Sequence, residues 1–391
     1  MNLKSKTKRK ICFPITSRAY YARQKLLLTE LQRDPRVKLE LILAASVLLD
    51  KYSKHVTADI EASGFTVAET HLNVIDGGNH VAMAKTACIT ALEMTNTFHK
   101  LSPDIVVVTG DRFEQLAIAM VAAYLNKSVA HIEGGDATGS IDESVRHAIT
   151  KLAHFHFVTN DGAYRRVIQM GENPEFVFNV GSLDIESIAN ARARKKFSIN
   201  RYGVGDNLDI TKPFIMAVFH PVTTEPDQFK RTSDALDAIA TLGLPTLWFW
   251  PNVDAGTNEI AEAIRHFREQ KPAAAKHFRF ITNVPADEFA TLLKRTACLV
   301  GNSSSGIKEG AFLGTPVVNI GSRQDRRMRG PNIVDVSYKK EDIQRAIRAQ
   351  LKNGRYPSSR LYYQPGASKQ VAELLATLPL YTQKVFHIHG A

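Results

Sequence analysis

Short apolar runs alternate along the chain with longer segments in which apolar residues recur with the period of a helix. In the first part, this pattern predicts strands near 10–15, 37–44, 104–109 and 128–132, separated by helices over 18–33, 78–100 and 113–126. Parallel strands linked by helices form a doubly wound sheet, and such sheets bind ligands beyond the carboxyl ends of their strands. We therefore expect functional residues directly after the predicted strands.

The alternation continues over 142–195, turns polar between Asn200 and Thr211, and restarts with an apolar run over 213–219. A second series then predicts strands over 245–249, 278–281, 297–300 and 316–320, with helices over 256–270, 286–295 and 305–313. The two series predict an α/β protein with a GT-B-like fold, in which two doubly wound, Rossmann-like domains face a central cleft. We place the domains at 1–200 and 201–365, and expect 366–391, with a helix over 367–377, to return to the first domain.

The composition agrees with this picture, because 391 residues of which 44% are hydrophobic and 23% charged are typical of a folded protein with two domains. Cys12, Cys88 and Cys298 form no C-x-x-C pair and are odd in number, which indicates reduced thiols and neither a disulfide framework nor a zinc site. No apolar run approaches the ~18 residues of a membrane span. We expect a cytoplasmic protein without a membrane partner.

The formal net charge of +11 raises the question of a nucleic-acid partner. Part of that charge lies in one short basic tail, at Lys4, Lys6, Lys8, Arg9 and Lys10. The other concentration follows a predicted strand and lacks interleaved aromatic residues, at Arg323, Arg326, Arg327 and Arg329. A small anionic ligand explains these arginines more simply, and we expect no nucleic-acid partner.

The segment G-N-S-S-S-G at 301–306 lies between a predicted strand and a predicted helix. Small residues there let the backbone approach a phosphate, and the hydroxyls of Ser303 and Ser304 are placed to donate to its oxygens. Glu309, about one turn into the helix, is placed to accept from a ribose diol. The alternative is that the serines only cap the helix, and for this loop alone the two interpretations are about equally good.

Three further loops follow predicted strands and supply polar side chains. Arg18 is placed to pair with a phosphate, His220 brings an imidazole to the cleft, and Asn252 offers an amide. Each has a plain structural alternative, namely a surface arginine, a structural histidine and a loop asparagine. Their common position after strands favours the ligand-binding interpretation.

Carboxylates gather after two strands of the first domain. Asp111 and Arg112 follow one strand, the next ends with His131 and Glu133, and Asp142 opens the following helix. Adjacent parallel strands lie ~4.8 Å apart, so Asp111 and Glu133 are predicted to face one small ring together. The alternative is that these acids only stabilise helix starts. Their clustering at one edge favours proton transfer.

Four stretches of the chain resemble the hydrolysing UDP-N-acetylglucosamine 2-epimerases: IEGGDATGSIDESVRHAITKLAHFHF, HPVTTE, PNVDAG and GNSSSGIKEGAFLGTPVVNIGSRQ. The resemblance runs from about residue 10 to 335. The family that the chain resembles includes bacterial enzymes of sialic acid and legionaminic acid pathways. Non-hydrolysing relatives usually carry His-Arg-Arg-Glu-Asn where this chain has HPVTTE. The resemblance therefore favours the hydrolysing branch and implies the GT-B fold.

The resemblance implies a role for each candidate site residue. It implies catalytic carboxylates at Asp111, Glu133 and Asp142. It implies substrate-binding residues at Arg18, Arg112, His131, His220, Asn252, Ser303, Ser304, Glu309 and Arg323. Neither a metal-ligand cluster nor a G-x-G-x-x-G fingerprint accompanies them, so we expect no metal and no cofactor, with a UDP-sugar as the substrate.

Two departures from the family pattern leave the identity of the sugar open. Val47 stands where many relatives have His, and GSLDIE at 181–186 replaces G-x-P-x-x-D, with Leu183 for proline and Glu186 for aspartate. We expect both regions to approach the sugar. The substrate is then UDP-N-acetylglucosamine or, as in legionaminic acid pathways, a 2,4-diacetamido-6-deoxy sugar.

The mechanism implied is loss of UDP from C1, removal of the C2 proton to give a glycal, and hydration with protonation of the opposite face of C2. The sequence does not assign the acid and the base. The alternatives are a GT-B glycosyltransferase, which leaves C2 unchanged, and a non-catalytic nucleotide-sugar sensor, which needs no carboxylates. We expect a homodimer or a homotetramer.

Overall fold

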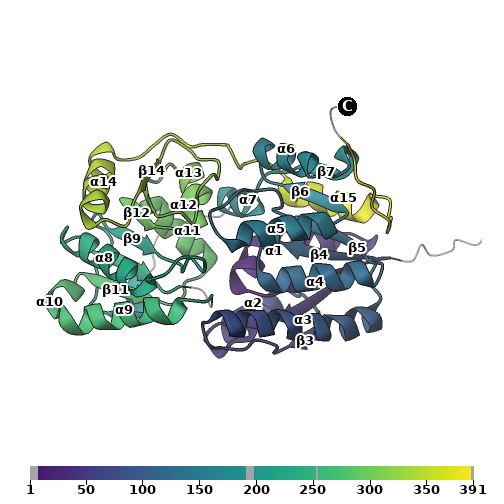
Figure 1. The fold of residues 1–391 in the computed structure, drawn as a ribbon, viewed down its shortest axis with the longest axis horizontal. Helices are drawn as coiled ribbons and strands as arrows, with labels where there is room; N and C mark the ends of the chain where they lie inside the picture. Colours follow the sequence, from purple (N-terminus) through teal and green to yellow (C-terminus); the bar gives the residue numbers. More distant parts are fainter. Residues whose placement is uncertain (1–7, 191–197, 252–253, 389–391) are drawn as a thin grey trace, which may run out of the picture.

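The computed structural model describes residues 8–190, 198–251 and 254–388 as two α/β domains, shown side by side in Figure 1. In the first, seven strands form a parallel sheet in the order β3-β2-β1-β4-β5-β6-β7. Its strands are β1 (Arg9–Ile15), β2 (Val37–Ala44), β3 (Val67–His71), β4 (Ile105–Thr109), β5 (Ser128–Ile132), β6 (Phe155–Val158) and β7 (Val177–Asn179). Its helices are α1 (Arg18–Arg33), α2 (Asp50–Ala62), α3 (His80–Leu101), α4 (Phe113–Tyr124), α5 (Ile141–Leu152), α6 (Asp161–Gln169) and α7 (Leu183–Asn190), with short 3-10 turns η1 (Ala45–Leu48) and η2 (Pro174–Phe176).

The second domain has a seven-stranded sheet in the order β14-β13-β12-β9-β10-β11-β8, in which β8 is antiparallel to β11. Its strands are β8 (Val204–Gly205), β9 (Ile215–Val218), β10 (Thr246–Phe249), β11 (Phe278–Ile281), β12 (Cys298–Gly301), β13 (Val317–Ile320) and β14 (Ile333–Val336). Its helices are α8 (Gln228–Ala240), α9 (Thr257–Gln270), α10 (Pro272–Ala275), α11 (Ala286–Arg295), α12 (Ser304–Ile307), α13 (Glu309–Leu313) and α14 (Lys340–Asn353), with the 3-10 turn η3 (Ile199–Arg201) before β8. Both domains are therefore Rossmann-like, as the alternating pattern predicts.

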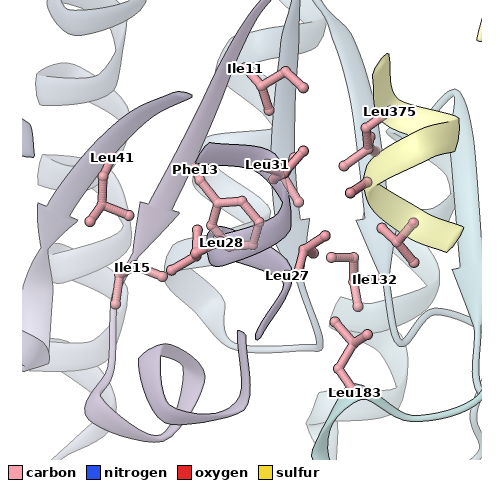
Figure 2. Close-up of a cluster of buried hydrophobic side chains, with 14 of the residues drawn as sticks. Ile11, Phe13, Ile15, Leu27, Leu28, Leu31, Leu41, Ile132, Leu183 and Leu375 are labelled. Carbon is pink, nitrogen blue, oxygen red and sulfur yellow. The ribbon is translucent and has the colours of Figure 1, made fainter. Parts of the chain in front are cut away.

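One core cluster of the first domain lies between the central strands and α1 (Figure 2), and a second lies on the other face of the sheet, under α3, α4 and α5. Leu27, Leu28 and Leu31 of α1 are fully buried against β1, because apolar residues three and four positions apart lie on one helix face. Ser17 begins the helix, since its Oγ accepts a hydrogen bond from the Tyr20 N–H at 3.4 Å. This packing fixes the first turn of α1, which borders the cleft described below.

The last helix, α15 (Ala367–Thr377), packs against α1 and α7 of the first domain. Leu375 belongs to the same apolar cluster as Ile11 and Leu31, and Figure 2 shows it facing them across the cluster. Arg9 adds a hydrogen bond to the Leu375 carbonyl at 2.8 Å. The chain thus crosses from the second domain back to the first, which is visible as the yellow segment of Figure 1.

Some elements differ from the sequence-based expectation. The pattern did not predict α2, β3, α8, β14 or α14. The helix expected over 305–313 is broken at Lys308 into α12 and α13. Among the described residues, Cys12 and Cys298 are buried and Cys88 is exposed, all as free thiols. None of the helices in the described ranges is long and apolar enough to cross a bilayer.

Candidate functional site

A cleft between the two domains collects residues that follow strands of both sheets. Eight of the predicted site residues line it: Arg18, Asp111, Arg112, Asp142, His220, Ser303, Ser304 and Arg323. Asp111 comes after β4, His220 after β9 and Ser303 after β12. Since β12 pairs with β9, the second-domain loops meet at one sheet edge. The rule that ligands bind beyond the carboxyl ends of strands thus locates this cleft.

Gly301 allows the serine loop to lie close to the neighbouring strand. Its φ is +137°, and a Cβ atom there would lie 2.1 Å from the Val218 carbonyl oxygen. The Asn302 side chain then ties the two loops together, because it accepts from the His220 N–H and donates to the His220 carbonyl, both at 2.8 Å. The local sequence therefore fixes His220 beside Ser303.

Asp111 is held as an anion at the first-domain wall of the cleft. Burial alone would raise its pKa, but the guanidinium groups of Arg146 and Arg327 outweigh burial and hold the pKa at about 2. Arg146 donates directly to Asp111 Oδ2 and also donates to the Asp136 carbonyl at 2.7 Å. An ionised carboxylate of this kind can accept a proton.

Asp142 lies in the first turn of α5 and has the opposite tendency. Burial and the nearby negative charge of Asp111 raise its pKa, although Arg323 Nη2 lies 3.7 Å from its Oδ2. Ser140 Oγ donates to the same oxygen at 3.0 Å. The cleft thus contains one carboxylate that stays ionised and one that retains a proton to higher pH, which is the pairing that acid–base chemistry needs.

His220 faces the cleft as a neutral imidazole at neutral pH. Burial and the positive charge of Arg323 lower its pKa to about 3. On the opposite wall, Arg112 is paired with Glu114 at 3.1 Å and with Asp254 of the second domain at 2.9 Å. Arg18 also reaches across, since its Nη2 donates to the Thr282 carbonyl at 3.2 Å. Both arginines therefore join the domains as well as line the cleft.

The serine loop supports both sequence-based interpretations. Ser303 caps α12, because its Oγ accepts from the Ser305 N–H at 3.3 Å and lies 2.8 Å from Ser305 Oγ. Ser303 and Ser304 nevertheless line the cleft. Capping and ligand binding are compatible here, because a hydroxyl that accepts the capping hydrogen bond still has an O–H that can donate to a phosphate oxygen.

Glu133 and Glu309 lie in a separate group next to the cleft, which we call the interdomain carboxylate cluster: Glu133, Asp184, Glu309, Arg23 and Lys308. Lys308 Nζ lies 3.0 Å from Glu133 Oε2, and Ser182 Oγ donates to Glu133 Oε1 at 3.3 Å. Glu133 has a φ of +67°, which a non-glycine residue seldom adopts. We had expected Glu133 to lie beside Asp111, because β4 and β5 are neighbours. In the structure Asp111 lines the cleft and Glu133 does not.

The family model described as UDP-N-acetylglucosamine 2-epimerase matches residues 29–376 of this chain. The chain belongs to the UDP-N-acetylglucosamine 2-epimerase family. A Legionella pneumophila member, named as a hydrolysing UDP-N,N'-diacetylbacillosamine 2-epimerase, is 32% identical over 377 residues, covering 96% of this chain and 97% of the relative. A UDP-N-acetylglucosamine 2-epimerase of Neisseria meningitidis serogroup B is 30% identical and covers 89% of each chain.

Solved structures, among them a UDP-GlcNAc 2-epimerase, share the fold of this family member. The Methanocaldococcus jannaschii enzyme in complex with UDP-GlcNAc and UDP aligns with a TM-score of 0.77 at 16% identity, covering 94% of this chain and 99% of that one. The co-structure of S. aureus MnaA with UDP aligns with a TM-score of 0.77 at 15% identity, covering 97% and 100%. These likenesses establish the GT-B-like architecture of the family member.

His131 is buried and does not line the cleft, so its role in substrate binding stays a prediction. Its side chain has no exposed surface, its Nε2 lies 2.8 Å from the Gly110 carbonyl, and its Nδ1 lies 3.1 Å from Thr150 Oγ1. The histidine instead supports the turn that carries Asp111. An alternating strand pattern cannot distinguish these roles, because both place a polar residue near the end of a buried strand.

The arginines after β13 have different partners. Arg323 lines the cleft, whereas Arg326 pairs with Glu143 at 3.1 Å and Arg329 with Asp335 at 2.9 Å. Arg327 is 8% exposed and lies 3.7 Å from Asp136. The expectation of one small anionic ligand therefore applies to Arg323, because the other three arginines do not line the cleft.

The positions where the chain departs from the family pattern lie mainly in the core. Val47 and Leu183 are each 1% exposed, and Figure 2 shows Leu183 in the apolar cluster. Glu186 Oε2 accepts from the Ser368 N–H of α15 at 2.8 Å. These three side chains do not line the cleft themselves, although Ser46 beside Val47 lines it and Asp184 beside Leu183 pairs with Arg23 there. Asn252 lies outside the described residues.

Sequence reasoning missed Arg23, which lines the cleft, and its neighbours Asp184 and Lys308. Asp184 follows β7, so the rule that functional residues come after strands could have found it. Arg23 lies inside a helix and Lys308 at a break between helices, and neither position carries a comparable signal.

Proposed function

We propose that this family member is a hydrolysing 2-epimerase of a UDP-2-acetamido sugar. It converts UDP-N-acetylglucosamine and water to N-acetylmannosamine and UDP, or performs the equivalent reaction on UDP-2,4-diacetamido-2,4,6-trideoxyglucose. Relatives from Legionella pneumophila and Campylobacter jejuni that are named as hydrolysing 2-epimerases support this branch, at 32% and 30% identity. Such a reaction serves the biosynthesis of nonulosonic acids, the class of sialic and legionaminic acids.

The observation that carries the proposal is that Asp111 and Asp142, whose pKa values shift in opposite directions, line one cleft together with cationic and hydroxyl side chains. Arg18, Ser303 and Ser304 supply a cation and two hydroxyls for the diphosphate. His220, being neutral, donates one hydrogen bond without adding charge. Donors placed where negative charge develops on the departing UDP lower the barrier to its loss.

In the first half of the reaction, the ionised Asp111 removes the C2 proton. The electron pair of the C2–H bond forms the C1=C2 double bond of a glycal, and the C1–O bond breaks with its electrons leaving on UDP. Asp111 is ionised at neutral pH, which is the form that accepts a proton, and Arg146 holds it at the cleft wall. Arg323 is placed to interact with the diphosphate, since it lines the cleft on the same domain as Ser303.

In the second half, water adds its oxygen to C1 while Asp142 gives its proton to the opposite face of C2. The proton lost by the water restores Asp142, and Asp111 returns its proton to solvent. The raised pKa of Asp142 suits it to act as the acid. Glu133 and Glu309 act from the interdomain carboxylate cluster, where they hold cationic side chains beside the cleft.

Incubation of the purified protein with each candidate UDP-sugar tests the substrate. Release of UDP together with a free 2-epimerised sugar from one of the two donors is the expected result. Transfer of the sugar to an acceptor with unchanged C2, or no release of UDP from either donor, would contradict the proposal. Asp161→Asn, on the exposed start of α6, serves as a matched control for Asp111→Asn.

We also propose that the family member assembles as a homodimer or homotetramer. Val81 and Leu92 of α3 are 63% and 69% exposed, and Tyr124 of α4 is 84% exposed. These two helices pack side by side. Sedimentation equilibrium checks the assembly, and a monomer at micromolar concentration would contradict it.

A further inference from the structure

The interdomain carboxylate cluster adjoins the cleft through a single side chain, Arg23 of α1. Its Nε lies 3.2 Å from Asp184 Oδ2 at the start of α7, and its Nη2 lies 3.9 Å from Glu309 Oε1 on α13. Arg23 itself lines the cleft, together with Ser303 and Ser304. Two carboxylates from different domains therefore flank a guanidinium that also faces the ligand space.

The two carboxylates are buried and incompletely hydrogen-bonded. The Asp184 side chain is 4% exposed and that of Glu309 is 8% exposed. Asp184 Oδ2 and Glu309 Oε2 make no hydrogen bond among the described residues, although Asp184 Oδ2 is in ion-pair range of Arg23. Buried polar atoms without partners cost free energy, so proteins retain them where they serve a further purpose.

The cluster also carries more negative than positive groups. The charged groups that act on Asp184 are Arg23 from α1, Glu133 after the end of β5, Lys308 from the break between α12 and α13, and Glu309 from α13. On its far side, α7 meets α15 through Glu186, which accepts from Ser368. With Asp184 ionised, three carboxylates face two cations, and one bound proton would balance the cluster.

We propose that Asp184 is a positioning residue of the cleft, which holds the Arg23 guanidinium at the cleft wall and, by gaining or losing one proton, sets how much of the Arg23 charge reaches the diphosphate of the ligand. This inference rests on the proposed function, because it requires a nucleotide diphosphate in the cleft. It concerns binding and not the chemistry at C2.

Asp184 gains or loses its proton near neutral pH, so a change of its charge is possible under ordinary conditions. Burial raises its pKa to about 7, and the negative charges of Glu133 and Glu309 act in the same direction, against the attraction of Arg23. A diphosphate bound at Arg23 adds more negative charge nearby and favours the protonated form of Asp184. Binding and protonation are therefore reciprocally linked, so the bound protein takes up a proton near neutral pH.

Calorimetric titration with UDP in buffers of different ionisation enthalpy measures this proton uptake. For the native protein we expect net uptake near pH 7, and a UDP Kd that weakens by about threefold to tenfold from about pH 6 to about pH 9. In Asp184→Asn the side chain is neutral at every pH, so the uptake assigned to Asp184 disappears and the Kd changes less with pH. UDP itself titrates near pH 6, so only the difference between the two proteins is decisive.

Two further variants separate this role from a general loss of structure. Arg23→Gln removes the group through which Asp184 senses the ligand, so the uptake is expected to fall in this variant as well, with weaker binding. Glu186→Gln changes a buried carboxylate on the same helix that faces α15, and we expect native proton uptake there.

Equal proton uptake and equal pH dependence in the native protein and Asp184→Asn would overturn the assignment of Asp184 while leaving the proposed function intact. Absence of UDP binding by the native protein would contradict the proposed function itself. The two failures are therefore distinguishable in one set of titrations.

Discussion

Arg146 of α5 and Asp111, after β4, form an ion pair at the wall of the cleft, with Arg146 Nη2 donating to Asp111 Oδ2. The Arg146 side chain is 1% exposed, while that of Asp111 is 25% exposed. The buried Arg146 side chain thus fixes the position of the Asp111 carboxylate, and the carboxylate itself remains accessible from the cleft. This arrangement keeps Asp111 ionised and immobile, as the proposed base requires.

Replacing Arg146 by Met is expected to destabilise the protein by about 3–5 kcal/mol, because it leaves carboxylates without their buried cation. It is also expected to raise the pKa of Asp111 toward its ordinary value. Urea unfolding measures the first effect. Lys25→Met is the control, since Lys25 and Asp59 form an exposed pair whose loss costs about 1 kcal/mol or less. Equal losses in the two variants would refute the role given to Arg146.

The pH dependence of kcat/KM tests Asp142 as the acid. Its pKa is raised by burial and by Asp111, and the protonated form is the active one. Activity is therefore expected to persist below that pKa and to fall as pH rises through it. Asp142→Asn is expected to lower kcat about 100-fold to 10,000-fold and to remove this descending limb. A descending limb that survives unchanged in the variant would assign it to another group.

The burial of His131 predicts that the free energy of unfolding depends on pH. Burial lowers its pKa to about 3 in the folded protein, whereas the unfolded chain has the ordinary value of about 6.5. Between these values only the unfolded chain binds the proton, so this contribution to stability is present above pH 6.5 and is lost as pH falls. The loss amounts to about 2 kcal/mol between pH 6.5 and pH 5.

Urea unfolding at the two pH values checks this contribution. His131→Gln is expected to be less stable at neutral pH but to lack this part of the pH dependence. His99→Gln, on the exposed side of α3, is expected to retain it. An unchanged slope in His131→Gln would show that other groups set the pH dependence.

The sequence predicts those parts of the fold in which one local pattern decides the structure. Ile105–Thr109 is an uninterrupted buried run, so its strand is evident from composition alone. β3 was missed because Glu69 and His71 interrupt an edge strand whose residues are mostly half-buried. Edge strands lack the continuous apolar signal of central strands, since they are covered on fewer sides.

The sequence predicts a cleft residue correctly where its position directly after a strand is enough to place it in the cleft. It does not do so where contacts between the two domains decide where the side chain lies. Asp111, His220 and Ser303 reach the cleft by that rule. Glu133 also follows a strand, but its positive φ turns the chain and its carboxylate meets Lys308 of the other domain. A sequence pattern does not contain that contact, because it depends on how the two domains meet.

In the proposed reaction the protein inverts C2 by removing its proton from one face and delivering a solvent-derived proton to the other. The most direct test is the reaction in D2O with the donor that releases UDP, followed by proton NMR of the free sugar. We predict deuterium at C2 of a 2-epimerised product, with the exchange lost in Asp111→Asn and kept in Asp161→Asn. Release of UDP with the original proton still at C2 would contradict the account.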